Sequence, residues 1–168
     1  MEDIYLGNPL LKKANVAQEF TQEQILEFMA CKQDPVYFAK QHVKIVSLDE
    51  GLVPFEPYDF QERLINNFHH NRFNICKMPR QTGKSTTSVS YLLHYAVFND
   101  NVNIGILANK AATARDLLGR LQTAYENLPK WMQQGIISWN KGSLELENGS
   151  KILAASTSAS AVRGMSFN

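Results

Sequence analysis

The chain has 168 residues, of which 44% are hydrophobic and 20% charged, a composition typical of a globular protein and not of a disordered one. Seventeen Lys and Arg residues against sixteen Asp and Glu residues give a formal net charge of +1, which excludes a strong global attraction to nucleic acid or to an anionic membrane. No apolar run approaches the roughly 20 residues that a transmembrane helix needs, and the acidic start of the chain does not resemble a secretory signal.

Residues 21–34 are predicted to form the first helix. Thr21 and Gln24 have the spacing of a capping box, in which each side chain bonds the backbone N–H of the other residue. The apolar side chains that share one face of this helix, and that we expect in the core, are Ile25, Phe28 and Met29. Asp34 and Pro35 then have the order of an N-cap and a first helical position, which predicts that a second helix begins there.

A short strand is expected at residues 44–47, followed by a turn-rich stretch at 48–57 and a longer helix at 58–71. The inward-facing residues of that helix are expected to be Leu64, Ile65 and Phe68. We interpret residues 1–54 as a helical N-terminal lead-in subdomain and residues 55–168 as the main domain.

From residue 72 onward, strand-like and helix-like segments alternate. Their expected bounds are 72–78 for a strand, 83–98 for a helix, 101–108 for a strand and 110–128 for a helix. This order is typical of a parallel α/β sheet flanked by helices. A β-hairpin is expected near the C-terminus, because Asn148 and Gly149 separate two strand-like runs and Asn-Gly is the strongest short hairpin signal.

The cysteines and histidines indicate no metal centre. Cys31 and Cys76 lie far apart in the sequence; they can pair in principle, but we expect two buried free thiols, as in a reducing compartment. The histidines show no ligand spacing with cysteine or with a carboxylate cluster, and we expect them at the surface or at helix ends. They are His42, His69, His70 and His94.

The stretch KMPRQTGKST, residues 77–86, has the second half of a phosphate-binding loop. In such loops backbone N–H groups and a helix N-terminus face the phosphates, and Gly83 would let the backbone approach them closely. Lys84 would direct its charge to the β- and γ-phosphates, and Ser85 its hydroxyl to Mg²⁺. The usual pattern has a further glycine where this chain has Met78, so a plain strand-to-helix turn remains the alternative.

Two residues near this stretch have side chains that suit a nucleotide. Arg80 lies inside the loop, where its guanidinium can reach a γ-phosphate or simply stay solvated. Gln61 lies upstream on a predicted helix, and its amide can accept and donate hydrogen bonds at once, as an adenine edge requires. A lone surface glutamine is common, so neither residue is decisive by itself.

Taken together, these segments resemble the ATPase domain of phage large terminase subunits of the myovirus type. The matching stretches are Y-x-F-Q at 58–61, PRQTGKST at 79–86, ILANKAATARDLLGRL at 106–121 and the most specific one, at 139–167. In this family the loop often lacks the first glycine and carries an arginine at the position of Arg80. The resemblance, over residues 55–168, implies an α/β P-loop NTPase fold of the ASCE, RecA/helicase-like kind, with a parallel sheet that is incomplete in this chain.

Carried over to this sequence, the family motifs imply a site for ATP and Mg²⁺. Arg80, as the sensor of the γ-phosphate, and Lys84 would be the catalytic residues. Gln61 would contact adenine, and Ser85 would hold Mg²⁺ through ATP. The residues implied to bind the nucleotide are Gln61, Arg80, Gln81, Thr82, Gly83, Lys84, Ser85 and Thr86.

Other parts of the family pattern are less defined here. Asn109 and Lys110 fall at the next helicase-like motif, with a helix cap as the plain alternative for Asn109. Arg163-Gly164 falls just ahead of the family's Walker B strand, where a role in DNA contact or domain coupling is a hypothesis. That strand ends in Asp-Glu and would follow Asn168, and a nuclease domain would come later. We therefore expect a fragment that binds ATP but hydrolyses it poorly.

The resemblance also implies partners and a location. The expected activity of the full-length protein is ATP hydrolysis coupled to translocation of double-stranded DNA into the procapsid. The expected partners are a portal protein and a small terminase subunit, in a homo-oligomeric ring, with no membrane. The protein would act in the host cytoplasm and transiently on the procapsid portal, and would not be secreted. Two alternatives stay open: a fragment of an SF2-type helicase or translocase, and a non-hydrolysing binding module with an apolar surface on residues 21–38.

Overall fold

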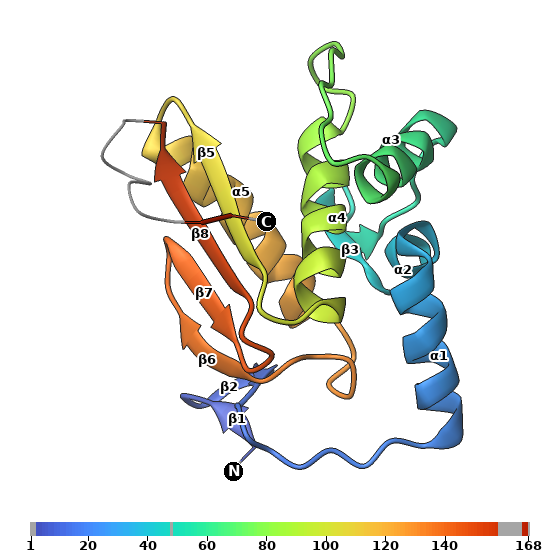
Figure 1. Cartoon of the computed structure of the whole chain (residues 1–168), viewed down its shortest axis with the longest axis vertical. Helices are drawn as coiled ribbons and strands as arrows, with labels where there is room; N and C mark the ends of the chain where they lie inside the picture. The colour runs from blue at the N-terminus through green and yellow to red at the C-terminus, as the bar shows by residue number, and fades with distance from the viewer. Residues whose placement is uncertain (1–2, 48, 158–165, 168) are drawn as a thin grey trace.

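The structure of the chain, a computed structural model, describes residues 3–47, 49–157 and 166–167 (Figure 1). Its helices are α1 (Gln22–Gln33), α2 (Pro35–His42), α3 (Asp59–His70), α4 (Lys84–Phe98) and α5 (Ala111–Glu126). Its strands are β1 (Ile4–Tyr5), β2 (Asn8–Lys12), β3 (Lys44–Ser47), β4 (Gly51–Pro54), β5 (Asn103–Ala108), β6 (Ile136–Trp139), β7 (Ser143–Leu146) and β8 (Lys151–Ser156). None of the described helices is long and apolar enough to cross a membrane.

The main sheet has four described strands in the order β5-β8-β7-β6 and is mixed. β5 pairs with β8 in parallel, from Asn103 opposite Lys151 to Ala108 opposite Ser156, whereas β6-β7 and β7-β8 are antiparallel. α5 packs on β5 and β8, and α4 packs beside α5 (Figure 1). The predicted α/β class is confirmed. The parallel pair expected from residues 72–78 and 101–108 is wrong, since β8 is the parallel partner of β5 among the described strands. β7 and β8 are antiparallel, as the predicted hairpin requires, and β6, which was not predicted, joins β7 antiparallel through a tight connection.

The hairpin predicted at Asn148-Gly149 is confirmed, and its turn is attached to α4. Gly149 has a φ of 80°, and a Cβ on it would lie 2.2 Å from Oδ1 of Asn101, so this turn requires glycine. The side-chain amide of Asn148 donates to the carbonyls of Ala96 at 2.9 Å and Asn99 at 3.0 Å, at the C-terminal end of α4. The hairpin therefore holds the sheet against the helix that precedes it.

The segment at residues 72–78, expected as a strand, is not one. Its apolar side chains are in solvent, with Ile75 at 100% and Phe73 at 83% exposure. A strand needs a neighbour that accepts and donates its backbone hydrogen bonds, and no described strand pairs with this segment. Among the described strands β5 pairs only with β8, so its second edge is open.

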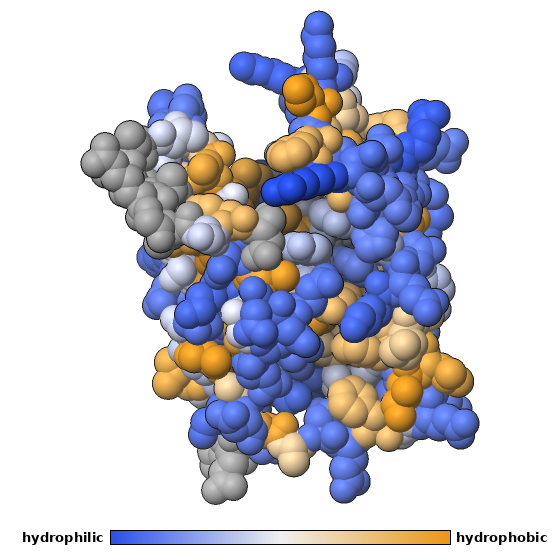
Figure 2. Space-filling view, viewed as in Figure 1, coloured by the Kyte–Doolittle hydropathy of each residue, from blue (hydrophilic) through white to orange (hydrophobic). Residues whose placement is uncertain are grey.

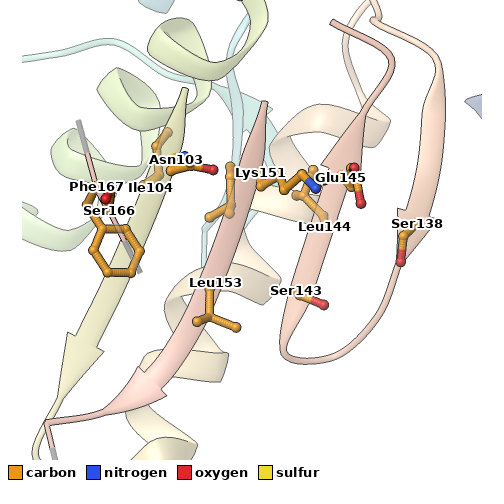
Figure 3. Close-up of a pocket in the computed structure, with 11 residues that line it drawn as sticks. Asn103, Ile104, Ser138, Ser143, Leu144, Glu145, Lys151, Leu153, Ser166 and Phe167 are labelled. Atoms are coloured by element: carbon orange, nitrogen blue, oxygen red, sulfur yellow. Dashed lines mark ion pairs between the residues drawn. The ribbon is translucent and has the colours of Figure 1, made fainter. Parts of the chain in front are cut away.

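The sheet face turned away from α5 carries a shallow cavity of about 390 Å³ (Figure 3). Phe167 lies at its β5 side, where a Cβ added to Gly105 would meet the ring at 2.9 Å. Across the cavity floor, Lys151 of β8 and Glu145 of β7 form an ion pair at 2.9 Å. The ring of Phe167 thus covers part of the sheet next to the open edge of β5.

The first two helices begin where their caps predict. The Thr21 hydroxyl accepts from the Gln24 N–H at 3.2 Å, and the Gln24 side chain accepts from the Thr21 N–H at 3.1 Å. Asp34 accepts from the N–H groups of Val36 at 2.8 Å and Tyr37 at 3.0 Å at the start of α2. Both caps satisfy N–H groups that would otherwise lack a partner within the helix.

The burial of α1 differs from the expectation. Ile25 is 51% and Met29 48% exposed, and only Phe28 of the predicted stripe packs inward, edge-on to Phe98 with ring centroids 4.8 Å apart. The fully buried residue of α1 is instead Cys31, because α1 meets α2 and α4 with a different face. Apolar side chains therefore gather at the lower right of Figure 2, over α1.

The N-terminal part is less purely helical than expected. Besides α1 and α2 it contains two antiparallel hairpins, β1-β2 and β3-β4, and β4 lies within the stretch expected to consist of turns. The inward positions of α3 are confirmed for Leu64 and Ile65, whereas Phe68 is half-buried. One hydrophobic core joins residues on both sides of the predicted domain boundary, for example Phe38 and Phe98.

Two polar residues are buried differently from the expectation. Both cysteines are free, but Cys76 is exposed and only Cys31 is buried. His94, expected at the surface or at a helix end, is 2% exposed and lies against the rings of Phe38 and Phe98. Its Nε2 is 2.9 Å from the carbonyl oxygen of Cys31, and among the described residues its Nδ1 has no partner. Burial lowers the pKa of His94 to about 4.

We predict that His94 makes the fold sensitive to acid. Its pKa in the folded chain, about 4, lies below its ordinary value of 6.5, so neutral His94 is compatible with the fold and protonation favours unfolding. The stability present above the ordinary pKa is lost as the pH falls through this window, on the order of 3 kcal/mol. His94→Gln keeps a donor for the Cys31 carbonyl and does not titrate.

Urea unfolding near neutral pH and near pH ~4.5 checks this prediction. The His94→Gln chain should lose less stability between the two conditions than the native chain, and His70→Gln, a change at an exposed histidine, should behave like the native chain. If the native and His94→Gln chains lose the same free energy of unfolding between the two pH values, the acid sensitivity does not come from His94.

Candidate functional site

The candidate site is the turn at residues 79–83, which leads directly into α4. The first residue of α4 is Lys84, and the helix start predicted from sequence is confirmed. The turn lies at the end of α4 next to α3, at the top of Figure 1. The residues before it form no strand, so the turn is held by its own hydrogen bonds and by α3.

The turn has its left-handed backbone conformations at Gln81, with a φ of 62°, and at Gly83, with a φ of 73°. Met78 has no positive φ, so this conformation does not require the glycine that the usual pattern has at that position. Gly83 is required for a second reason: a Cβ on it would lie 2.3 Å from Nε2 of Gln61. Holding Gln81 in the left-handed region costs about 1 kcal/mol or more.

Side chains of the turn bind its own carbonyl groups. The Thr82 hydroxyl donates to the carbonyl of Pro79 at 3.0 Å. The Lys84 ammonium donates to the carbonyl of Met78 at 3.3 Å and to that of Pro79. The positive charge of Lys84 is therefore folded back under the turn and lies close to the N-terminus of α4.

The N-terminus of α4 presents three N–H groups without a partner in the helix. The first bond at this end runs from the Thr87 N–H to the Gly83 carbonyl at 2.9 Å, which leaves the N–H groups of Lys84, Ser85 and Thr86. A helix of 15 residues also places about half a positive charge at this end. Together with the Lys84 ammonium, these groups favour an anion such as phosphate.

The remaining predicted residues of the turn and of the start of α4 differ in exposure. Arg80, Gln81 and Ser85 are exposed, whereas Thr82 and Thr86 are half-buried. Within the described part of the chain, Arg80 takes part in no ion pair, so its guanidinium is available to an incoming anion. Ser85 lies on the first turn of α4, directly after Lys84.

Gln61 connects α3 to the turn and is not a surface residue, since it is only 4% exposed. Its Oε1 accepts from the N–H of Tyr58 at 2.9 Å, and its Nε2 donates to the carbonyl of Thr82 at 3.2 Å. Both ends of the amide are thus occupied by backbone groups. Gln61 fixes the position of the turn relative to α3, and its predicted contact with adenine stays a prediction.

Sequence reasoning missed two features near α1 to α3. Tyr58, 70% exposed, is stacked on Phe60 with ring centroids 5.7 Å apart, which puts two parallel aromatic rings beside the start of α3. His42 lies at the end of α2, as expected, but the structure also brings it next to Glu27 and Cys31, with the three ligand atoms within 4.8 Å of one another. The two helices that bring them together pack on each other, and spacing along the sequence does not show this.

Asn109 and Lys110, the second motif predicted from the sequence, directly follow the C-terminal end of β5. Lys110 is the residue that caps α5, and its side chain makes no capping hydrogen bond. Asn109 precedes the cap and is exposed, so the plain reading of Asn109 as a helix cap is wrong. Arg163 and Gly164 lie outside the described residues.

Comparisons with known proteins bear on the site and on the fold. Residues 75–168 match the protein family described as terminase large subunit, T4likevirus-type, N-terminal. The fold is similar to that of the HK97 bacteriophage large terminase in its crystal structure, with a TM-score of 0.64 and 19% sequence identity. That similarity covers 80% of this chain but only 29% of the HK97 chain, so this chain spans under a third of the length of that protein.

We predict opposite effects for two alanine substitutions at glycine. Gly83→Ala should destabilise the turn by about 1–2 kcal/mol or more, because the new Cβ meets Gln61 and the left-handed backbone disfavours alanine. Gly119→Ala, in α5 with open space around it, should stabilise the chain by about 0.5–1 kcal/mol.

Urea unfolding measures the change in the free energy of unfolding of the whole chain. Hydrogen exchange of the amides of residues 82–87 measures the change in the local stability of the turn. Gly83→Ala should raise exchange in this segment and Gly119→Ala should not. Native-like exchange and stability in the Gly83→Ala chain would show that the turn has another conformation.

Proposed function

The chain belongs to the family of terminase large subunits of the T4likevirus type, and on this premise we propose that it is the ATP-binding part of a motor that packages DNA. The observation that carries the proposal is the turn at residues 79–83. It places Lys84 and the free N–H groups of α4 at one point, next to Arg80, which forms no ion pair with the described residues. This is the combination that a triphosphate requires.

In the proposed site the phosphates lie at the N-terminus of α4. The N–H groups of Lys84, Ser85 and Thr86 bind their oxygens, and the Lys84 ammonium moves from the carbonyls of the turn to the β- and γ-phosphates. Gln81 and Thr82 supply the backbone that surrounds the phosphates. The Ser85 hydroxyl holds Mg²⁺ between the β- and γ-phosphate oxygens.

Arg80 is proposed as the residue that senses the γ-phosphate. It is exposed and lies in the turn, so its guanidinium can bind the terminal phosphate without a domain movement. A planar guanidinium can also stabilise the charge that spreads over the γ-phosphate during hydrolysis. Arg80 and Lys84 are therefore the proposed catalytic residues of this chain.

Gln61 is proposed to contact adenine in addition to holding the turn. In the structure its amide is bonded to Tyr58 and Thr82, and one N–H and one oxygen lone pair are left for a base. The stacked rings of Tyr58 and Phe60 lie next to Gln61 in the sequence and offer an aromatic face to a base.

For the complete protein we propose that ATP hydrolysis drives double-stranded DNA into a procapsid. The proposed partners are a portal protein, a small terminase subunit and further copies of the large subunit in a ring, in the cytoplasm of the infected host. The family supports these proposals. The contacts to DNA would be made to its backbone, which fits a motor that must move along any sequence.

Two alternative functions have to be distinguished from this proposal. An SF2-type helicase would share the turn, but the family match over residues 75–168 favours a terminase. A binding module without nucleotide is supported by one observation, the exposure of Ile25, Leu26 and Met29 on α1. If the chain is such a module, substitution of Lys84 should not impair its function.

Titration of the chain with a fluorescent ATP analogue and Mg²⁺ tests the site. We expect saturable binding that Lys84→Ala weakens by at least about tenfold, since a phosphate contact to a charged group is worth about 1.5–3 kcal/mol. Lys141→Ala, a change at an exposed lysine in the β6-β7 connection, should bind like the native chain. Arg80→Ala should weaken binding of the triphosphate more than that of the diphosphate. Equal binding by the native and Lys84→Ala chains would overturn the site.

We also predict that the 168-residue chain turns over ATP slowly. A motor ATPase needs a carboxylate that orients the attacking water, and the family supplies it from an Asp-Glu pair after the loop. In this sequence Asp49-Glu50 precedes the turn and no Asp-Glu pair follows it. Phosphate release should stay well below the roughly 1 s⁻¹ at the lower end of typical enzymes. Faster release that Lys84→Ala abolishes would show that another group of this chain orients the water.

A further inference from the structure

Glu27, Cys31 and His42 form a compact cluster of metal-ligand side chains between α1 and α2. Glu27 and Cys31 stand four residues apart on α1 and share one face of that helix, and His42 is the last residue of α2. Oε1 of Glu27 lies 2.7 Å from Nε2 of His42 and 3.5 Å from Sγ of Cys31. All three ligand atoms lie within 4.8 Å of one another.

These separations suit one tetrahedral ion. Zinc binds thiolate at about 2.3 Å and imidazole or carboxylate at about 2.0–2.2 Å, so neighbouring ligands of a tetrahedral site are about 3.3–3.6 Å apart. The Glu27–Cys31 separation of 3.5 Å already has this value, and the Glu27–His42 separation of 2.7 Å has to grow by about 0.6–0.9 Å. Thiolate, imidazole and carboxylate together favour zinc over hard cations such as Mg²⁺.

The surroundings hold two of the ligands in place. The Tyr37 hydroxyl donates to Oε2 of Glu27 at 3.0 Å and leaves Oε1 directed at His42 and Cys31. The His42 ring contacts the rings of Phe38 and Trp131, with centroids 6.3 Å and 6.2 Å away. Outer groups that orient ligands in this way strengthen metal binding.

The cluster is closed on one side and open on the other. Cys31 is fully buried, whereas the side chains of His42 and Glu27 keep 14% and 29% exposure. An ion can therefore enter past Glu27 and His42 and reach the sulfur.

We propose that Glu27, Cys31 and His42 bind one Zn²⁺ ion, which links the end of α2 to α1. Tyr37 acts as the positioning residue for Glu27. The site lies away from the turn at residues 79–83, so it is independent of the nucleotide site proposed above (Figure 1).

Zinc binding at this site has to release protons. The ion binds the thiolate and the neutral imidazole, and the thiol proton leaves to solvent. Affinity should therefore rise with pH.

The test is titration of the chelator-treated 168-residue chain with Co²⁺, followed by displacement with Zn²⁺. We expect one equivalent of Co²⁺ to give the charge-transfer absorption of a cobalt–thiolate bond, Zn²⁺ to abolish it, and excess Mg²⁺ to leave it unchanged. Cys31→Ser should remove the band, and His42→Gln should weaken binding by about tenfold or more. Cys76→Ser and His70→Gln, which change the exposed cysteine and an exposed histidine, should bind like the native chain.

The native and Cys76→Ser chains decide the question even if a change at buried Cys31 disturbs folding. No thiolate band in the native chain overturns the proposal, as does a band that Cys76→Ser removes. A band that survives in Cys31→Ser, in a chain with native circular dichroism, overturns it as well. A band that persists in Cys76→Ser assigns the ion to Cys31.

Discussion

The enclosure of α4 is the constraint on which the rest of the structure depends. Its residues Val89, Leu93, Ala96, Val97 and Phe98 are all at or below 6% exposure, and the helix packs against α2, α3 and α5. Each large side chain buried in this way contributes about 1.5–3 kcal/mol. Because α4 is held on several sides, both of its ends have fixed positions. The turn before its N-terminus is bonded to α3 through Gln61. The hairpin that joins β7 and β8 is bonded to its C-terminal end through Asn148.

The turn before α4 adopts its conformation without a glycine at position 78. The two left-handed positions are Gln81 and Gly83, and neither is the position that the usual motif reserves for that glycine. Gln61 takes over part of the support, since it donates to Thr82 and closely approaches Gly83. The same glutamine caps the start of α3, so the turn and α3 are expected to move together.

The segment before the turn shows the limit of a local strand signal. Residues 72–78 alternate as a strand should, yet Phe73 and Ile75 are in solvent. Local pattern makes a strand possible, but backbone hydrogen bonds to a neighbour make it stable. β5 carries the open edge of the described sheet, and an open edge can pair with a further strand of the same chain or of another.

The sequence by itself determined what depends on hydrogen bonds within a few residues. The caps at Thr21 and Asp34, the hairpin turn at Asn148-Gly149 and the start of α4 at Gly83-Lys84 were predicted correctly, because donor and acceptor lie within four positions of each other. The sequence pattern correctly predicted the burial of Leu64 and Ile65 on α3, but elsewhere the tertiary structure decided burial. The sequence did not show that α1 buries Cys31 and exposes Ile25, that His94 and Gln61 are enclosed, or that His42 meets Glu27. Each of these depends on contacts between elements far apart in the chain, and the face that an element buries is chosen by its neighbours.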